Sequence, residues 1–130
     1  MNEQELKQRT YTFALRIIDL ADSLPQSRTG NVIANQVIRS GTSVAANYRA
    51  LCRAKSRADF INKTSIVEEE ADESSFWLQL LIDRSLLAAR RVEPLLTEAN
   101  ELTAIFVASR KTASGRQRPF ENRKPRIENP

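Results

Sequence analysis

The first 113 positions of the chain are almost free of helix-breaking residues, and this constrains its fold more than any other feature. The sequence has 3 glycines and 5 prolines in 130 residues, and four of these eight follow Ser114. Glycine and proline destabilise helix interiors more than other residues do, so long helices are permitted before that point. Apolar residues recur there every three or four positions, which is the spacing of one helix face.

Four segments with this periodicity follow one another along the chain. We predict helices from about Asn2 to Leu24, from Gly30 to about Ala54, from Ser56 to about Arg84, and from about Val92 to Lys111. Residues 85–91 are compatible with either a loop or a frayed turn. Short connections favour antiparallel neighbours. The sequence therefore predicts an all-α fold, an antiparallel up-and-down four-helix bundle over residues 1–113 with a disordered basic C-terminal tail over residues 114–130.

Several local signals support these boundaries. Asn2 and Ser56 each precede an acidic residue by three positions, which is typical of a capped helix start. Pro25 ends the first helix, and Pro94 is expected in the first turn of the fourth. Gly41 falls on the apolar stripe of the second helix, which favours close packing against another helix over a kink.

The composition excludes several classes of function. The chain has no histidine and one cysteine, Cys52, so Ser-His-Asp and Cys-His triads, histidine-containing zinc sites and an internal disulfide are excluded. We predict no metal and no cofactor. No run of 18 apolar residues is present, and an acidic N-terminus is unlike a secretory signal. We therefore expect a cytoplasmic protein that does not enter a membrane.

Basic side chains are concentrated in two places. Residues 1–113 carry 15 Lys/Arg against 14 Asp/Glu, whereas residues 114–130 carry 5 against 2. The other concentration follows the second helix, where arginines recur every four residues and are expected to line one face. Arginine matches phosphate oxygens well. The nucleic-acid-binding residues that we nominate are Arg49, Arg53, Lys55, Arg57 and Lys63; a solvated surface is the alternative.

A polar stripe lies beside the apolar stripe of the second helix. Its members are Gln36, Arg39, Ser40, Ser43 and Asn47. Spacings of three and four place them on one side of the helix. We interpret them as a structural seam that sets the register between helices, with a ligand or partner site as the alternative.

The third helix contains five acids between Glu68 and Glu73. Consecutive acids point around the helix, so a solvated face or pairing with the basic stretch is favoured. An enzyme would need a pocket built on Glu69, Asp72 and Glu73. Next to this cluster, we predict Phe76 in the core, and Trp77 either at a subunit interface or in the core.

Three motifs in order carry a family resemblance. They are the stretch from Asn35 to Ala50, the stretch from Ile66 to Glu73 followed by Trp77-Leu78, and the stretch from Glu98 to Phe106. Over about residues 4–113 the chain resembles the bacterial four-helix-bundle proteins encoded in intervening sequences of 23S rRNA genes. That family is related to the accessory variability protein of diversity-generating retroelements.

The resemblance implies a homopentamer, a ring with a central opening, and no known enzymatic activity. The retroelement relatives work beside a reverse transcriptase and bind nucleic acid through a basic surface, which no motif of this sequence locates, so the binding residues above are nominated from spacing alone. Our leading hypothesis is a non-enzymatic homo-oligomer that binds RNA or DNA through basic helical surfaces and the tail. The alternative is an assembly or adaptor module whose partner is a protein.

Overall fold

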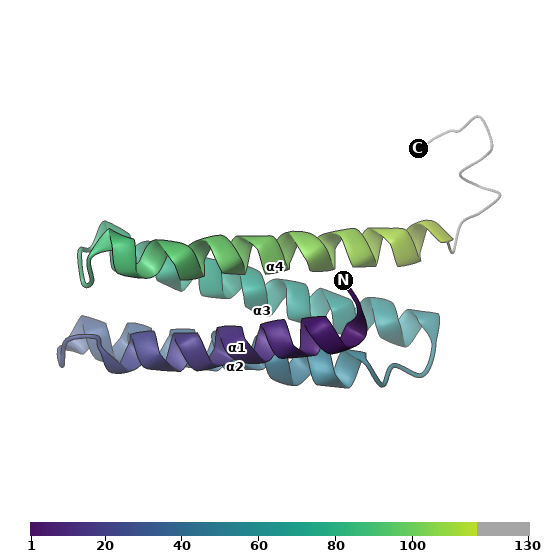
Figure 1. Cartoon of the computed structure of the whole chain (residues 1–130), viewed down its shortest axis with the longest axis horizontal. Helices are drawn as coiled ribbons and strands as arrows, with labels where there is room; N and C mark the ends of the chain where they lie inside the picture. Colours follow the sequence, from purple (N-terminus) through teal and green to yellow (C-terminus); the bar gives the residue numbers. More distant parts are fainter. Residues whose placement is uncertain (117–130) are drawn as a thin grey trace, which may run out of the picture.

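The computed structural model describes residues 1–116 and consists of four long helices in one bundle (Figure 1). The helices are α1 (Glu3–Asp22), α2 (Arg28–Leu51), α3 (Arg57–Asp83) and α4 (Ala89–Arg116). Each runs antiparallel to the one before it (Figure 1). The described residues contain no strand. The predicted antiparallel four-helix bundle is therefore confirmed. The tail that we predicted to be disordered lies, from residue 117 onward, outside the described residues.

The helices pack in chain order around one core. α1 contacts α2, α2 contacts α3, and α3 contacts α4, whereas α4 closes the bundle against α1 less extensively. Across the core, the rings of Tyr48 on α2 and Phe106 on α4 lie 5.7 Å apart between centroids. The fully buried large side chains come from all four helices and include Phe13, Val37, Leu78 and Leu102. Among the described residues, no helix has an apolar stretch long enough to cross a bilayer.

Serine and asparagine side chains cap three of the helix starts. Asn2 and Glu5 form the predicted reciprocal capping box, with bonds of 2.8 and 2.9 Å. Ser56 accepts a hydrogen bond from the Asp59 amide, as predicted. Ser27 caps α2 in the same way, so this helix begins at Arg28 rather than at Gly30. It also ends at Leu51, three residues before the predicted end.

The connection between α3 and α4 explains the ambiguity of residues 85–91. The amide of Ser85 donates to Ile82, and that of Leu86 donates to Leu81. This is the pattern of a Schellman motif, whose turning residue adopts a left-handed conformation. Ser85 does so with φ 55°. Because glycine usually occupies that position, a serine there is not recognisable in the sequence as the end of a helix.

α4 extends beyond its predicted bounds at both ends. It begins at Ala89 rather than Val92, so Pro94 lies inside the helix and not in its first turn. Proline keeps a helical φ there and costs the hydrogen bond that its missing N–H would have made. α4 ends at Arg116, which is three residues past the predicted end of the bundle.

α1 and α2 approach each other closely at Gly41. A Cβ atom built on Gly41 would lie 2.9 Å from two carbon atoms of the Ile17 side chain and 3.1 Å from its Cβ. Ile17 itself is fully buried. The close packing predicted for Gly41 is confirmed, because no side chain larger than hydrogen fits without moving Ile17.

We expect Gly41→Ala to lower the free energy of unfolding by about 1–2 kcal/mol, because overpacking against Ile17 outweighs the gain in helix propensity. Urea denaturation followed by circular dichroism measures the change. Gly115→Ala is the control, since a Cβ there meets nothing within 4 Å. A Gly41→Ala protein as stable as the parent would contradict the close approach.

We expect Ser85→Gly to raise the free energy of unfolding by about 1 kcal/mol, because glycine adopts the left-handed conformation without the Cβ penalty. Ser23→Gly is the matched control. Ser23 also ends a helix, but its φ is −92°, so glycine offers no relief there. Equal effects of the two substitutions in thermal unfolding would show that Ser85 is not strained.

Candidate nucleic-acid interface

The predicted nucleic-acid-binding side chains gather at one end of the bundle, where α2 ends and α3 begins. Because α2 ends at Leu51, Arg53 and Lys55 lie in the connection and Arg57 is the first residue of α3. The expectation that Arg49, Arg53 and Arg57 line one helix face is therefore wrong. Two tight turns, closed by bonds from the Arg53 and Ala54 amides, interrupt the helix and keep these cations near one another at the chain reversal.

An open hollow of about 470 Å³ lies at this end. Its lining consists of Ala50, Arg53, Lys55, Asp59 and Lys63. The one carboxylate in it is already occupied. Asp59 accepts a hydrogen bond of 2.5 Å from the Lys63 ammonium and one of 3.0 Å from the Lys55 amide. The Lys63 bond and the Lys55 amide hold the pKa of Asp59 below its usual value, so the carboxylate stays ionised.

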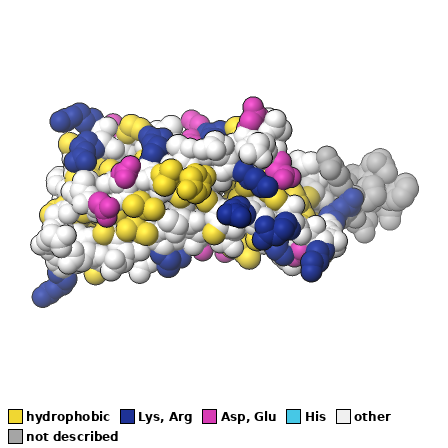
Figure 2. Space-filling view, turned by 60° about the horizontal axis from the view of Figure 1, so that its bottom comes forward, with side chains coloured by type: hydrophobic (Ala, Val, Ile, Leu, Met, Phe, Trp, Pro, Cys, Tyr) yellow, Lys and Arg dark blue, Asp and Glu magenta, His cyan; other side chains and the backbone are white. Residues whose placement is uncertain are grey.

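The other cations of this end are free of carboxylate partners. Within residues 1–116, Arg49, Arg53, Lys55 and Arg57 are exposed and form no ion pair. Residues 49–63 hold five Lys/Arg and one acid, a balance of +4, which equals the net charge of the whole chain. In Figure 2, cationic side chains cluster on this end of the bundle. The surface can accept several negative charges.

Three other arginines, Arg9, Arg39 and Arg110, pair with acids of a neighbouring helix. Arg9 on α1 binds Glu98 on α4 through two hydrogen bonds of 2.7 and 2.8 Å, and it also reaches Glu101. Arg110 on α4 binds Glu68 on α3 at 2.6 Å. These pairs are absent from the sequence predictions, because partners 42 and 89 positions apart are recognisable only once the neighbouring helices are known.

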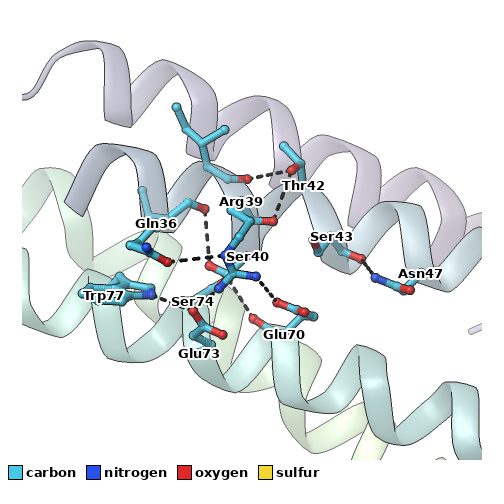
Figure 3. A network of polar contacts seen from close by, with 12 residues as sticks. Gln36, Arg39, Ser40, Thr42, Ser43, Asn47, Glu70, Glu73, Ser74 and Trp77 are labelled. Atoms are coloured by element: carbon cyan, nitrogen blue, oxygen red, sulfur yellow. Dashed lines mark hydrogen bonds and ion pairs between the residues drawn. The ribbon is translucent and has the colours of Figure 1, made fainter. Parts of the chain in front are cut away.

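The polar stripe of α2 faces α3 (Figure 3). The Ser74 hydroxyl donates to the Ser40 hydroxyl at 2.9 Å, and both side chains are fully buried. Beside them Arg39 bonds to Glu70 at 3.2 Å and pairs with Glu73. Gln36 accepts a long 3.4 Å bond from Arg39. The Ser40–Ser74 bond and the two Arg39 pairs join α2 to α3, as expected of a structural seam.

Ser43 and Asn47 continue the stripe without reaching α3. The Asn47 amide nitrogen donates to the backbone carbonyl of Ser43 at 2.9 Å (Figure 3). The bond lies within one helix, so it ties the asparagine to its own turn. These two residues therefore contribute local order rather than a bond between helices.

Trp77 belongs to the same network. Its indole N–H donates to Glu73 at 3.0 Å, and its ring meets that of Phe76 edge to face, with centroids 5.0 Å apart. Trp77 is half-buried. Phe76 was predicted in the core, and this is wrong: its side chain is 55% exposed. The buried face of α3 is occupied by Ser74, Leu78 and their periodic neighbours, and Phe76 points away from it.

The acid cluster does not form a pocket. Glu69 and Asp72 are exposed, whereas Glu73 faces α2 and binds Arg39 and Trp77. Over residues 1–116, no three acids or cysteines converge in a way that would hold a metal ion. The three carboxylates named for an enzyme therefore do not face one another: two are on the outer surface and the third is bound at the contact between α2 and α3.

The Trp77–Glu73 hydrogen bond predicts a specific pH dependence. The indole donor and then Arg39 lower the pKa of Glu73 from 4.5. A lowered carboxyl pKa contributes stability that is present above pH 4.5 and is lost as the pH falls through the folded-state pKa. We expect Trp77→Phe to destabilise the protein at pH 7 and to do so less at pH 3, as measured by urea denaturation.

Glu73→Gln provides the control for this prediction. With no titrating group at position 73, Trp77→Phe made in the Glu73→Gln background is expected to cost the same at both pH values. A loss from Trp77→Phe that is independent of pH in the parent protein would assign the effect to packing alone.

Comparison with known proteins identifies the family. The family model described as 23S rRNA-intervening sequence protein matches residues 2–108. The chain is also similar to the crystal structure of a protein of unknown function from the S23 ribosomal protein family of Bacteroides thetaiotaomicron VPI-5482. The two are 35% identical with a TM-score of 0.77, over 85% of this chain and 99% of that one. No curated protein matches. The chain belongs to the 23S rRNA-intervening sequence protein family.

Proposed function

We propose that the protein is a non-enzymatic homo-oligomer that binds RNA or DNA in the cytoplasm through the basic end of its bundle. The observation that carries this proposal is the charge of residues 49–63, where five cations face one acid. The acid is held by Lys63, which leaves the other four cations for an outside partner. Phosphate groups are the partners that such a surface neutralises most effectively.

The surroundings of this end add to the proposal. α4 ends there too (Figure 1), so the 5 Lys/Arg of residues 114–130 follow directly from this end in the sequence. The hollow between Arg53, Lys55 and Lys63 is open enough for a backbone phosphate. The family name refers to 23S rRNA, which makes RNA the first nucleic acid to test.

The proposed role is that of an accessory protein. The described residues bring together charged groups for binding but no set of groups for bond cleavage, so a reaction on the nucleic acid would be performed by a separate enzyme, such as a reverse transcriptase. The family resemblance favours five copies in the oligomer. Several copies would present several basic ends to one nucleic-acid molecule and raise the avidity.

A second function is favoured by a different observation. Tyr11, Leu15, Ile66 and Phe76 are between 43% and 56% exposed, and exposed apolar side chains in groups are typical of protein contacts. An assembly or adaptor module would use these surfaces, with its arginines pairing with acids of another subunit. Arg53→Glu separates the two functions. Loss of nucleic acid at constant oligomer mass supports the first, and altered mass supports the second.

We expect the double variant Arg53→Glu, Lys55→Glu to bind a mixed-sequence RNA roughly tenfold or more weakly than the parent, and to lower the slope of log K against log salt by about 2. Fluorescence anisotropy at several salt concentrations measures both quantities. The double variant Arg90→Glu, Arg91→Glu is the matched control. These two arginines are exposed and lie in the first turn of α4, at the opposite end of the bundle.

Three outcomes would contradict the proposal. They are the absence of binding to either RNA or DNA at low salt, an affinity that does not fall as salt rises, and an equal loss of affinity in both double variants. The last outcome would mean that binding follows overall net charge and not the basic end.

A further inference from the structure

Two outer faces of the bundle expose large apolar side chains, and they belong to helices that lie diagonally opposite each other. On α1, Tyr11 is 56% and Leu15 is 47% exposed; on α3, Ile66 is 43% and Phe76 is 55% exposed. α1 and α3 are not neighbours around the bundle, because each packs mainly on α2 and α4. The two faces therefore point to different sides of one molecule.

The α1 face is an apolar patch beside a cationic groove. Tyr11 and Leu15 are four residues apart and so adjoin on the helix surface, and the half-buried Ile18 extends them by another turn. In Figure 2, which looks onto the side where α1 and α2 lie, hydrophobic side chains gather in the middle of the face. Beside Tyr11, an open groove of about 210 Å³ is lined by Lys7 and Arg49 among others. Lys7 pairs with Glu3, so Arg49 is the cation of this groove that has no carboxylate partner among the described residues.

The α3 face has the opposite character. Along the exposed side of the helix, Ile66, Glu69, Asp72 and Phe76 follow one another at spacings of three, three and four. At 1.5 Å per residue this stripe is about 15 Å long. Two projecting apolar side chains lie on either side of two carboxylates, which form no ion pair within residues 1–115. α2, by contrast, contains three arginines and no acid.

We infer that the α1 face of one copy binds the α3 stripe of a second copy of this chain. Apolar side chains meet apolar side chains, and Glu69 and Asp72 approach Arg49 in the α1–α2 groove. Every copy of the chain carries both faces, so the protein can act as its own partner. This inference rests on the proposed homo-oligomer and deepens it, because it names the surfaces that meet.

The two faces differ, so the contact is heterologous and each bound copy still has one free face. Such contacts continue from copy to copy until they close into a ring or extend into a filament. A face that paired with its own equivalent would stop at two copies. This difference provides the test.

Each face can be disabled separately in the full-length chain. We expect Leu15→Glu and Phe76→Glu each to reduce the mass measured by light scattering to that of the monomer, 14.7 kDa. In an equimolar mixture, the intact stripe of the Leu15→Glu copy binds the intact patch of the Phe76→Glu copy. The mixture is therefore expected to form dimers that cannot grow. Ala104→Glu, on the exposed side of α4, is the control and keeps the parental mass.

A double variant at exposed positions tests the contact with less risk of unfolding the protein. Glu69→Lys combined with Asp72→Lys changes exposed side chains alone, and we expect it to lower the mass while circular dichroism retains the helical spectrum. The inference is overturned if the parent is monomeric at tens of micromolar, if Leu15→Glu and Phe76→Glu keep the parental mass, or if their mixture remains monomeric.

These experiments test the contact between copies independently of nucleic-acid binding. A monomeric Leu15→Glu variant retains Arg53 and Lys55, so we expect it to bind RNA, with lower avidity than the oligomer. If the variants change the mass as expected and no form binds nucleic acid, the contact between copies stands and the proposed nucleic-acid role falls. If RNA binds but the parent is monomeric, the reverse holds.

Discussion

The apolar stripes of four helices meet in one core, and the other features of the bundle depend on this burial. Phe13, Ile17 and Leu78 are almost completely withdrawn from water, and each such side chain contributes about 1.5–3 kcal/mol relative to exposure. The ion pairs between helices are partly exposed, and pairs of that kind contribute about 0–1 kcal/mol each. Burial therefore supplies the stability, and the polar contacts select which helix faces which. The close approach at Gly41 and the buried Ser40–Ser74 bond are two points where that selection is sharpest.

The ion pairs have a second consequence, which concerns the charges left over. Glu68, Glu70, Glu73, Glu98 and Glu101 are held by arginines of neighbouring helices. The acidic middle of α3 is thereby divided into carboxylates that serve the fold and the exposed Glu69 and Asp72. No comparable acids are available to the cations between Arg49 and Arg57. A chain with a modest net charge thus acquires one strongly basic end and one acidic stripe, because the fold pairs charges between neighbouring helices and leaves those at the end of α2 and on the outer face of α3 without partners among the described residues.

The sequence predicted the elements of the fold well, because helical periodicity and capping residues are local signals. Asn2 with Glu5, Ser56 and Gly41 were recognised from their neighbours alone.

The errors share a cause in tertiary or unusual backbone geometry. Ser85 occupies a position where glycine is the usual signal, and the start of α4 was missed with it. Phe76 was assigned to the core by residue type, although its position on the helix places it outside. The pairing of Arg110 with Glu68 depends on which helices are adjacent, and no local pattern carries that information. The basic residues were found by type and spacing, but the chain reversal after Leu51 brings them together in a different way than a helix face would.

Arg49 lies between the basic end of the bundle and the apolar face of α1, and it belongs to both proposed binding surfaces. It lines the groove beside Tyr11, and it belongs to the stretch of cations that extends to the hollow around Arg53 and Lys55. An arginine engaged with Glu69 or Asp72 of a second copy is withdrawn from phosphate, whereas Arg53 and Lys55 remain at the end of the bundle. Assembly would then remove one cation per copy from the nucleic-acid-binding surface and would bring the basic ends of several copies together. Because several linked ends gain avidity that one end lacks, this exchange favours the oligomer as the form that holds nucleic acid.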